Sequence, residues 1–288
     1  MGRPAPIHAH DLEAGLAELY RDFFGRAEKK RRWSLRRDIP WRPRRPPRDP
    51  AVGDVVESFL AVELYLPDYV ANAMATFRPS RACAWFYANW GYEESKHSLA
   101  LGDWLLWSGL RSEEQLADLE GRVFQREWHV PHDSAVGMLV YAMAQELATG
   151  LTYRNLRRRV EERGGDPALT ALLGFLGVDE QAHHNFFLRA VPLFLRHDRP
   201  GTLAQVRRVL HHFAMPAVHE MADGTDRVAA IKALRVFDDE MYFRDVYQPI
   251  LAALGVSRPE LRRGAAPPPA AAGVNGLVLP APPVRQAA

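Results

Sequence analysis

Glu94-Ser-Lys-His97 and Glu180-Gln-Ala-His183 decide how this sequence is interpreted, because each places a glutamate three residues before a histidine. Both segments lie in stretches with helical periodicity, where residues three apart share one face and can reach a single metal ion. Two further glutamates, Glu63 and Glu146, each precede one of these pairs in an apolar helical stretch of their own. Four carboxylates and two imidazoles from four helices are the ligands of a carboxylate-bridged dinuclear iron site in a four-helix bundle.

The charge of these six residues predicts two metal ions rather than one. Four glutamates that converge in an apolar bundle repel one another, and a buried carboxylate without a partner normally takes up a proton. Two divalent ions cancel four carboxylates, while neutral histidines complete the coordination as nitrogen donors. A single Glu-x-x-His usually lies on a solvated helix face, but the four segments together argue against that explanation. Iron suits the oxygen-rich set, manganese can replace it at one or both positions, and zinc would bind without redox chemistry.

The sequence around these segments predicts an all-α fold, a four-helix bundle with additional helices. Apolar residues recur every three or four positions, whereas alternating strand patterns and Asn-Gly hairpin turns are absent. Pro67 cannot donate to the carbonyl of Glu63, so we expect the first helix to bend at that glutamate. Breaks at prolines and glycines divide the chain into predicted helices at 52–76, 80–108, 134–163, 167–197, 202–222 and 225–254.

Composition and charge divide the 288 residues into three parts. Residues 1–50 form an arm that carries a dense run of Lys and Arg with Trp33 within it, residues 51–263 form the helical domain, and residues 264–288 form a flexible Ala/Pro-rich tail. The arm is interpreted as a solvated segment or as a docking site for an acidic protein, since no nucleic-acid-binding motif accompanies its charge.

The expected compartment is the cytoplasm. Cys83 is the only cysteine, so neither an intramolecular disulfide nor a thiolate metal cluster can form. The N-terminus lacks the apolar segment of a signal peptide, and no apolar stretch approaches the roughly 20 residues that span a bilayer. We therefore expect a protein without membrane insertion.

Several segments together resemble the soluble acyl-acyl-carrier-protein desaturases, a ferritin-like family. The segments are Glu63-Leu-Tyr-Leu-Pro67-Asp-Tyr69, Trp90-Gly-Tyr-Glu-Glu94-Ser-Lys-His97, Gln145-Glu-Leu-Ala-Thr149, Asp179-Glu-Gln-Ala-His183 and Met215-Pro216-Ala217, the last followed by Asp223-Gly224. Their order and spacing are similar to those of the family motifs. The resemblance runs from about Trp33 to Gly224, and the segment after Gly224 shows little of it.

The resemblance implies roles for nine residues. The metal ligands would be Glu63, Glu94 and His97 at one iron, and Glu146, Glu180 and His183 at the other, with Glu94 and Glu180 as bridges. Thr149 would lie beside the oxygen-binding site and relay protons, although a helical threonine can instead bond back to a carbonyl. Trp33 would form an electron route with Asp179 and His97, or it would anchor the basic arm. Within Glu93-Glu94, Glu93 lacks ligand spacing and is expected beside the ligands or at the surface.

The implied function is an oxygen-dependent desaturase that inserts a double bond into an acyl chain carried on acyl carrier protein, in fatty acid biosynthesis. The implied partners are that carrier and a ferredoxin-type electron donor, and the implied assembly is a homodimer. The same ligands also support a hydroxylase or an N-oxygenase. A non-catalytic, ferritin-like iron-binding protein is the alternative from a different functional class.

Overall fold

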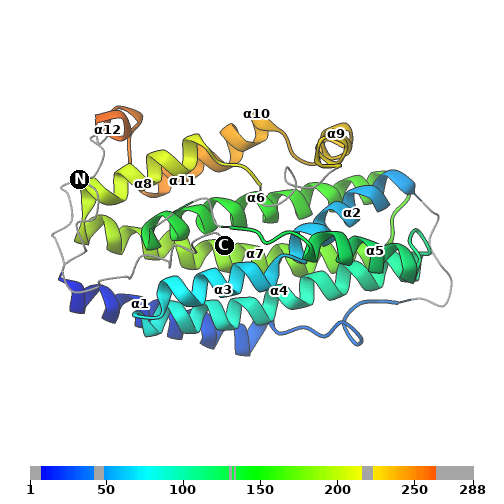
Figure 1. Cartoon of the computed structure of the whole chain (residues 1–288), viewed down its shortest axis with the longest axis horizontal. Coiled ribbons are helices and arrows are strands. Elements are labelled where there is room, and N and C mark those ends of the chain that lie inside the picture. The colour runs from blue at the N-terminus through cyan, green and yellow to red at the C-terminus, as the bar shows by residue number, and fades with distance from the viewer. Residues whose placement is uncertain (1–7, 42–48, 130–131, 133, 216–222, 264–288) are drawn as a thin grey trace, which may run out of the picture.

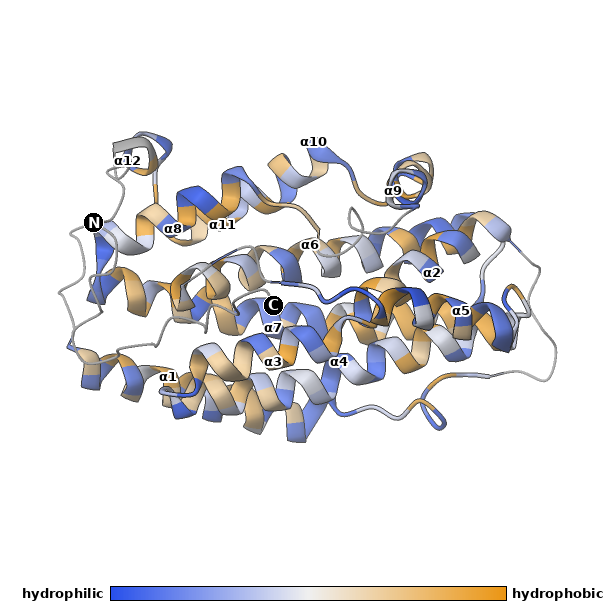
Figure 2. Cartoon of the chain, viewed as in Figure 1, coloured by the Kyte–Doolittle hydropathy of each residue, from blue (hydrophilic) through white to orange (hydrophobic). Residues whose placement is uncertain are grey.

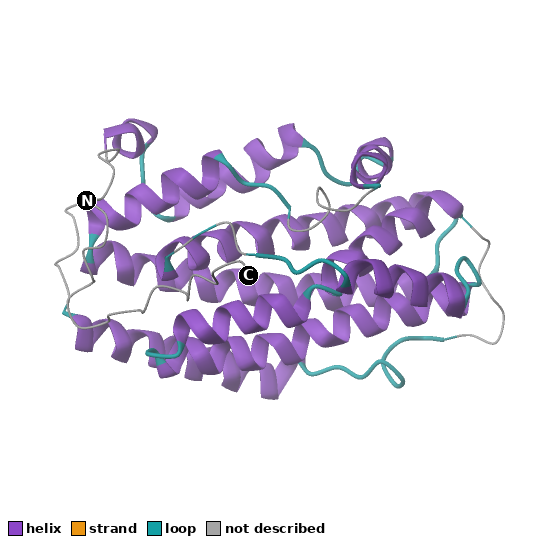
Figure 3. Ribbon diagram, in the orientation of Figure 1, coloured by secondary structure: helices purple, strands orange, loops and turns teal. Residues whose placement is uncertain are grey.

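The computed structural model describes residues 8–41, 49–129, 132, 134–215 and 223–263. Within these ranges the chain consists of helices and loops, with no strand (Figure 1, Figure 3). The elements are α1 (Ala9–Arg26), η1 (Ala27–Arg31), α2 (Pro50–Glu63), α3 (Leu66–Phe77), α4 (Arg81–Ser108), α5 (Glu113–Phe124), α6 (Ala135–Glu162), α7 (Pro167–His197), α8 (Arg199–His211), α9 (Gly224–Ala233), α10 (Asp239–Met241), η3 (Tyr242–Tyr247), α11 (Gln248–Ala253) and α12 (Arg258–Arg263).

The bundle is built on three long helices, α4, α6 and α7, with α2 and α3 completing it. Each long helix begins at a predicted position, where a side chain accepts a hydrogen bond from the first turn: Ser80 caps α4, Ser134 caps α6 and Asp166 caps α7. Most helices carry both polar and apolar residues, as expected when one face is turned to the core (Figure 2). The predicted all-α bundle with additional helices is confirmed.

The predicted single helix at 52–76 is wrong, because the chain forms α2 and α3 with a break between them. Glu63 is the last residue of α2, and α3 begins at Leu66, with Pro67 in its first turn. Pro67 has no amide hydrogen for the carbonyl of Glu63, so the expected bend becomes a complete interruption. The interruption places Glu63 at a helix end that faces the bundle interior.

The two C-terminal predicted helices are also shorter than expected. Helix α8 ends at His211, and residues 216–222 lie outside the described part. Helix α9 ends because Arg235 adopts a left-handed conformation, with φ of 52°, and the amide of Val236 donates back to the carbonyl of Ile231 at 3.1 Å. Val236 is thereby fully buried, so tertiary packing overrides the helical pattern predicted for 225–254.

Helix α1 lies within the predicted arm and was not expected from the sequence. Its apolar side chains Leu12, Leu16 and Phe23 are buried, and the helix packs on α4 and α7. Residues 1–7 and 42–48 of the arm, the tail at 264–288, and Pro216 and Ala217 of the family motif lie outside the described residues. The boundaries of the three predicted parts therefore stay predictions. None of the helices in the described part of the chain is both long and apolar enough to cross a lipid bilayer.

Candidate metal centre

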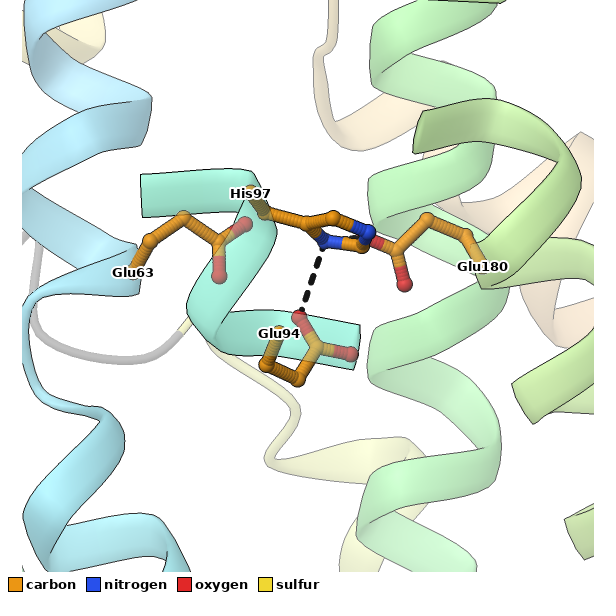
Figure 4. A group of neighbouring side chains, drawn as sticks. All are labelled: Glu63, Glu94, His97 and Glu180. Carbon is orange, nitrogen blue, oxygen red and sulfur yellow. Dashed lines mark ion pairs between the residues drawn. The ribbon is translucent and has the colours of Figure 1, made fainter. Parts of the chain in front are cut away.

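The six predicted ligands meet in the middle of the bundle. Glu63 comes from the end of α2, Glu94 and His97 from α4, Glu146 from α6, and Glu180 and His183 from α7. Each of them is buried, and both histidines are completely inaccessible to solvent. Figure 4 shows Glu63, Glu94, His97 and Glu180 converging from three helices. The helical spacing of three residues therefore turns both Glu-x-x-His pairs inward, as predicted.

The ligand atoms form two overlapping groups, within each of which all atoms lie within 4.8 Å of one another. The groups are Glu63, Glu94, His97 and Glu180, and Glu94, Glu146, Glu180 and His183. Glu94 and Glu180 belong to both groups. This is the arrangement expected of two bridging carboxylates between two metal positions.

Both histidines present the same ring nitrogen to the cluster. Nδ1 of His97 lies 3.0 Å from Glu94 Oε2 and 3.4 Å from Glu180 Oε1. Nδ1 of His183 lies 3.0 Å from Glu94 Oε1 and 3.2 Å from Glu146 Oε2. A protonated Nε2 leaves the Nδ1 lone pair directed at the carboxylates, where a metal ion would accept it.

Burial and the crowding of carboxylates shift the pKa values within the cluster. Burial raises the pKa of Glu63 and Glu146 well above their ordinary values, and the neighbouring glutamates add to the shift. Burial alone would lower the pKa of His97 and His183, but the surrounding carboxylates raise both well above the ordinary value. Protons held by these groups would supply the positive charge, and two divalent cations would replace those protons.

The donor set also fits metal ions at the level of single atoms. Glu94 Oε1 and His97 Nδ1 are buried, and neither makes a hydrogen bond with acceptable geometry to any described group. Buried polar atoms are rarely left unsatisfied in this way. Four carboxylates with two imidazoles suit iron or manganese. The residues present therefore fit a pair of such ions.

An outer carboxylate contacts the far nitrogen of each histidine. Asp179 Oδ2 lies 3.4 Å from Nε2 of His97, and Glu93 Oε2 lies 2.7 Å from Nε2 of His183. The contacts cross between helices, because Asp179 precedes Glu180 on α7 and Glu93 precedes Glu94 on α4. Glu93 is buried, so of the two places predicted for it, the one beside the ligands is observed. Such partners fix the ring orientation of ligating histidines.

Trp33 and Asp179, which the sequence singled out, are in direct contact. Trp33 Nε1 donates to Asp179 Oδ2 at 2.7 Å, and the indole stacks on Phe175 with ring centroids 5.3 Å apart. Burial would raise the pKa of Asp179, but its hydrogen bond and charge interaction with His97 lower the pKa to about 2. Trp33, Asp179 and His97 thus form one connected line. Arg31, which the sequence analysis missed, also donates to Asp179, at 2.7 Å.

A cavity of about 180 Å³ reaches the cluster from the side of α9 and η3. Its walls are mainly aromatic and aliphatic, and its lining includes Glu63 of the cluster and Thr149, three residues after Glu146. The hydroxyl of Thr149 bonds none of the described groups, so the predicted alternative of a bond back to a carbonyl is not observed. Tyr153 also lines the cavity, and its hydroxyl donates to Glu63 Oε1 at 2.5 Å. No sequence motif pointed to Tyr153.

Comparison with known proteins identifies the family. The model of the fatty acid desaturase family matches residues 58–255 of the chain. The chain belongs to this family. The desaturase-family chain is 27% identical to acyl-[acyl-carrier-protein] desaturase 6 of rice, Oryza sativa subsp. japonica, over 174 residues. These residues are 57% of the chain and span only 42% of the rice protein.

Two solved structures share the fold of this desaturase-family chain. The first is DesA2 of Mycobacterium tuberculosis H37Rv, with a TM-score of 0.67 and 18% identity over 89% of this chain and 100% of that one. The second is an R2-like ligand-binding oxidase with a Mn/Fe cofactor, with a TM-score of 0.54 and 17% identity over 84% of this chain and 93% of that one. At these identities the likeness concerns the fold alone.

Proposed function

We propose that the chain is an oxygen-dependent desaturase that uses two iron ions, or manganese at one or both positions, to insert a double bond into an acyl chain carried on acyl carrier protein. The observation that carries this proposal is the cavity. It is apolar along its walls and its lining includes Glu63 and Thr149, so an alkyl chain within it would lie against the candidate metal centre. An iron-storage function gives no reason for such a cavity.

The cavity suits a reaction in which position is the only means of selection. The methylenes of an acyl chain are almost identical, so the protein must choose among them by what it holds next to the oxidant. Phe59, Phe213 and Met215 give walls without hydrogen-bonding side chains, whereas the outer rim carries Lys232 and Asp239, which pair at 3.1 Å. This gradient from a charged rim to an apolar interior supports a substrate with a polar end outside and an alkyl chain inside.

Bound iron would supply the oxidising power that unactivated C–H bonds require, in a reaction that consumes one O₂, two external electrons and two protons, and releases two waters with the alkene. The chain's own residues would hold the protons and guide the electrons. The free hydroxyl of Thr149 on the cavity wall is placed to donate a proton near the cluster. The line from Trp33 through Asp179 to His97 connects the cluster with the segment after η1.

The proposed partners approach from different sides. The segment after η1, which contains Trp33, lies on the lower side of the bundle in Figure 1, whereas α9 lies on the upper side. The exposed cations of η1 and of the segment after it, among them Lys29, Lys30 and Arg36, therefore do not surround the cavity rim. We propose that a ferredoxin-type electron donor uses the side of Trp33 and that the acyl carrier protein uses the side of α9. A homodimer and a cytoplasmic location are further parts of the proposal.

Product analysis by mass spectrometry tests the function. Iron-loaded protein is incubated with acyl carrier protein carrying acyl chains of several lengths, together with ferredoxin, its reductase and oxygen. Loss of two hydrogens that depends on reductant, and that disappears in Glu180→Ala, is the expected result. Gain of one oxygen atom would indicate a hydroxylase or N-oxygenase. Two bound irons without any product from these substrates would overturn the proposed function and leave the metal centre intact.

A further inference from the structure

Arg31 occupies an unusual position for a member of a basic run. It is the last residue of η1, and only 8% of its side chain is exposed. Its Nη1 donates to Glu93 Oε2 at 2.9 Å and to Asp179 Oδ1 at 2.7 Å. The guanidinium also lies over the ring of Phe23, 4.8 Å from the centroid. One nitrogen of a buried cation thus joins two carboxylates from different helices, α4 and α7.

These two carboxylates are the ones that contact the histidines. Glu93 Oε2, which accepts from Arg31, also lies 2.7 Å from His183 Nε2. Asp179 accepts from Arg31 through Oδ1 and contacts His97 through Oδ2. A single carboxylate therefore connects Arg31 to each of the two histidines.

The next two residues in sequence, Arg32 and Trp33, each donate to only one of these two carboxylates. Arg32 Nη1 donates to Glu93 Oε1 at 2.6 Å, and Trp33 Nε1 donates to Asp179 Oδ2 at 2.7 Å. Among the hydrogen bonds of the described residues, Arg31 alone contacts both Glu93 and Asp179. The three consecutive residues thus differ in which histidine they support, and this difference can be tested.

We propose that Arg31 is a positioning residue that orients both candidate histidine ligands at once and so couples the two metal positions. The inference rests on the proposed metal centre. With Arg31 removed, Arg32 would still pair with Glu93, but no hydrogen-bonding cation would join Glu93 to Asp179, and the repulsion between these two buried carboxylates would move them apart. Each carboxylate would then turn the histidine that it contacts. Loss of Arg31 would therefore weaken both positions, whereas loss of Arg32 would weaken one.

The test is an anaerobic titration of the full chain with Mn²⁺ alone, followed by the electron paramagnetic resonance signal of the free ion. The wild-type chain should bind two ions. Arg31→Met should lower the affinity for both ions by roughly 10–100-fold, the effect usual for residues that support metal ligands. Arg32→Met removes the same charge one residue later and should weaken one ion while leaving the second at wild-type affinity. Arg31→Lys, which keeps one cation between the carboxylates, should recover much of the loss.

Near-ultraviolet circular dichroism and urea unfolding of the metal-free variants show whether each one folds. If Arg31→Met does not fold, Arg31→Gln replaces it, because it is neutral but retains an amide donor. Equal effects of Arg31→Met and Arg32→Met would overturn the inference, since only the loss of positive charge would then matter. Two ions at wild-type affinity in Arg31→Met would also overturn it. A wild-type chain that binds no Mn²⁺ would instead refute the metal centre itself.

Discussion

Tyr153 joins the candidate metal centre to the cavity through a single hydrogen bond. Tyr153 is 1% exposed and lines the cavity. Its hydroxyl donates a hydrogen bond to Glu63 Oε1 at 2.5 Å. Glu63 is the candidate ligand at the C-terminal end of α2, where the helix stops. The phenol hydroxyl therefore fixes the orientation of the Glu63 carboxylate, as Asp179 and Glu93 fix the orientation of the histidine rings.

We expect Tyr153→Phe to lower the free energy of unfolding of the metal-free chain by about 1–2 kcal/mol, because a buried carboxyl loses its donor. The measurement is urea unfolding. Tyr87→Phe is the matched control, because the hydroxyl of Tyr87 is buried and bonds none of the described groups. Its removal should be neutral or slightly stabilising. A similar loss of stability in both variants would show that the Tyr153 hydrogen bond contributes little.

At the scale of helices, the sequence predicted those features that depend only on neighbouring residues. The starts of the long helices could be predicted from their N-cap residues, Ser80, Ser134 and Asp166, because a cap depends only on the next few residues. The i, i+3 spacing predicted for the same reason that each Glu-x-x-His pair shares one helix face, and both pairs lie in the buried cluster. The turn at Val236 was missed, because it depends on packing against distant residues.

The contacts of Arg31 could not be predicted either, since Arg31 and Asp179 are separated by 148 positions in sequence. Nothing in a run of basic residues distinguishes the one that becomes buried. The resemblance had implied a role for Asp179, and an acidic residue stands before each candidate ligand glutamate, Glu93 before Glu94 and Asp179 before Glu180, which was a further signal for the outer carboxylates.

The cap of α7 gives a prediction at this scale. Asp166 Oδ1 accepts from the amides of Ala168 and Leu169, while Oδ2 accepts from Trp104 Nε1 of α4 at 2.8 Å. Asp166→Ala removes a cap worth about 1 kcal/mol and the partner of a buried indole, for a total loss of about 2–3 kcal/mol in unfolding free energy. Chemical denaturation measures this loss of unfolding free energy.

Asp198→Ala is the comparison for that loss. Asp198 caps α8 through the amide of Gly201, and it is exposed. Asp198→Ala should lower the free energy of unfolding by only the roughly 1 kcal/mol of a helix cap. If both variants lose the same stability, the hydrogen bond from Trp104 to Asp166 contributes nothing beyond the helix cap.

For the whole molecule, the candidate metal centre is the point at which the separate parts of the chain meet. Its ligands come from α2, α4, α6 and α7, the cavity of α9 and η3 opens onto it, and the segment after η1 supports it from the other side. Ions bound there would hold four helices together in the folded state and would have no comparable site in the unfolded chain. Metal binding should therefore appear as global stability.

We expect the melting temperature to rise on loading with Mn²⁺ and to fall back after a chelator. At a free ion concentration of 100 times the dissociation constant, each bound ion adds about 2.7 kcal/mol to the free energy of unfolding, so two ions add about 5 kcal/mol. Differential scanning calorimetry with and without the ion measures the shift. Glu180→Ala should abolish most of it, because Glu180 belongs to both groups of ligand atoms. Glu161→Ala removes a carboxylate that is 51% exposed on the surface of α6 and should retain the full shift. An undiminished shift in Glu180→Ala would place the stabilising ions elsewhere on the protein.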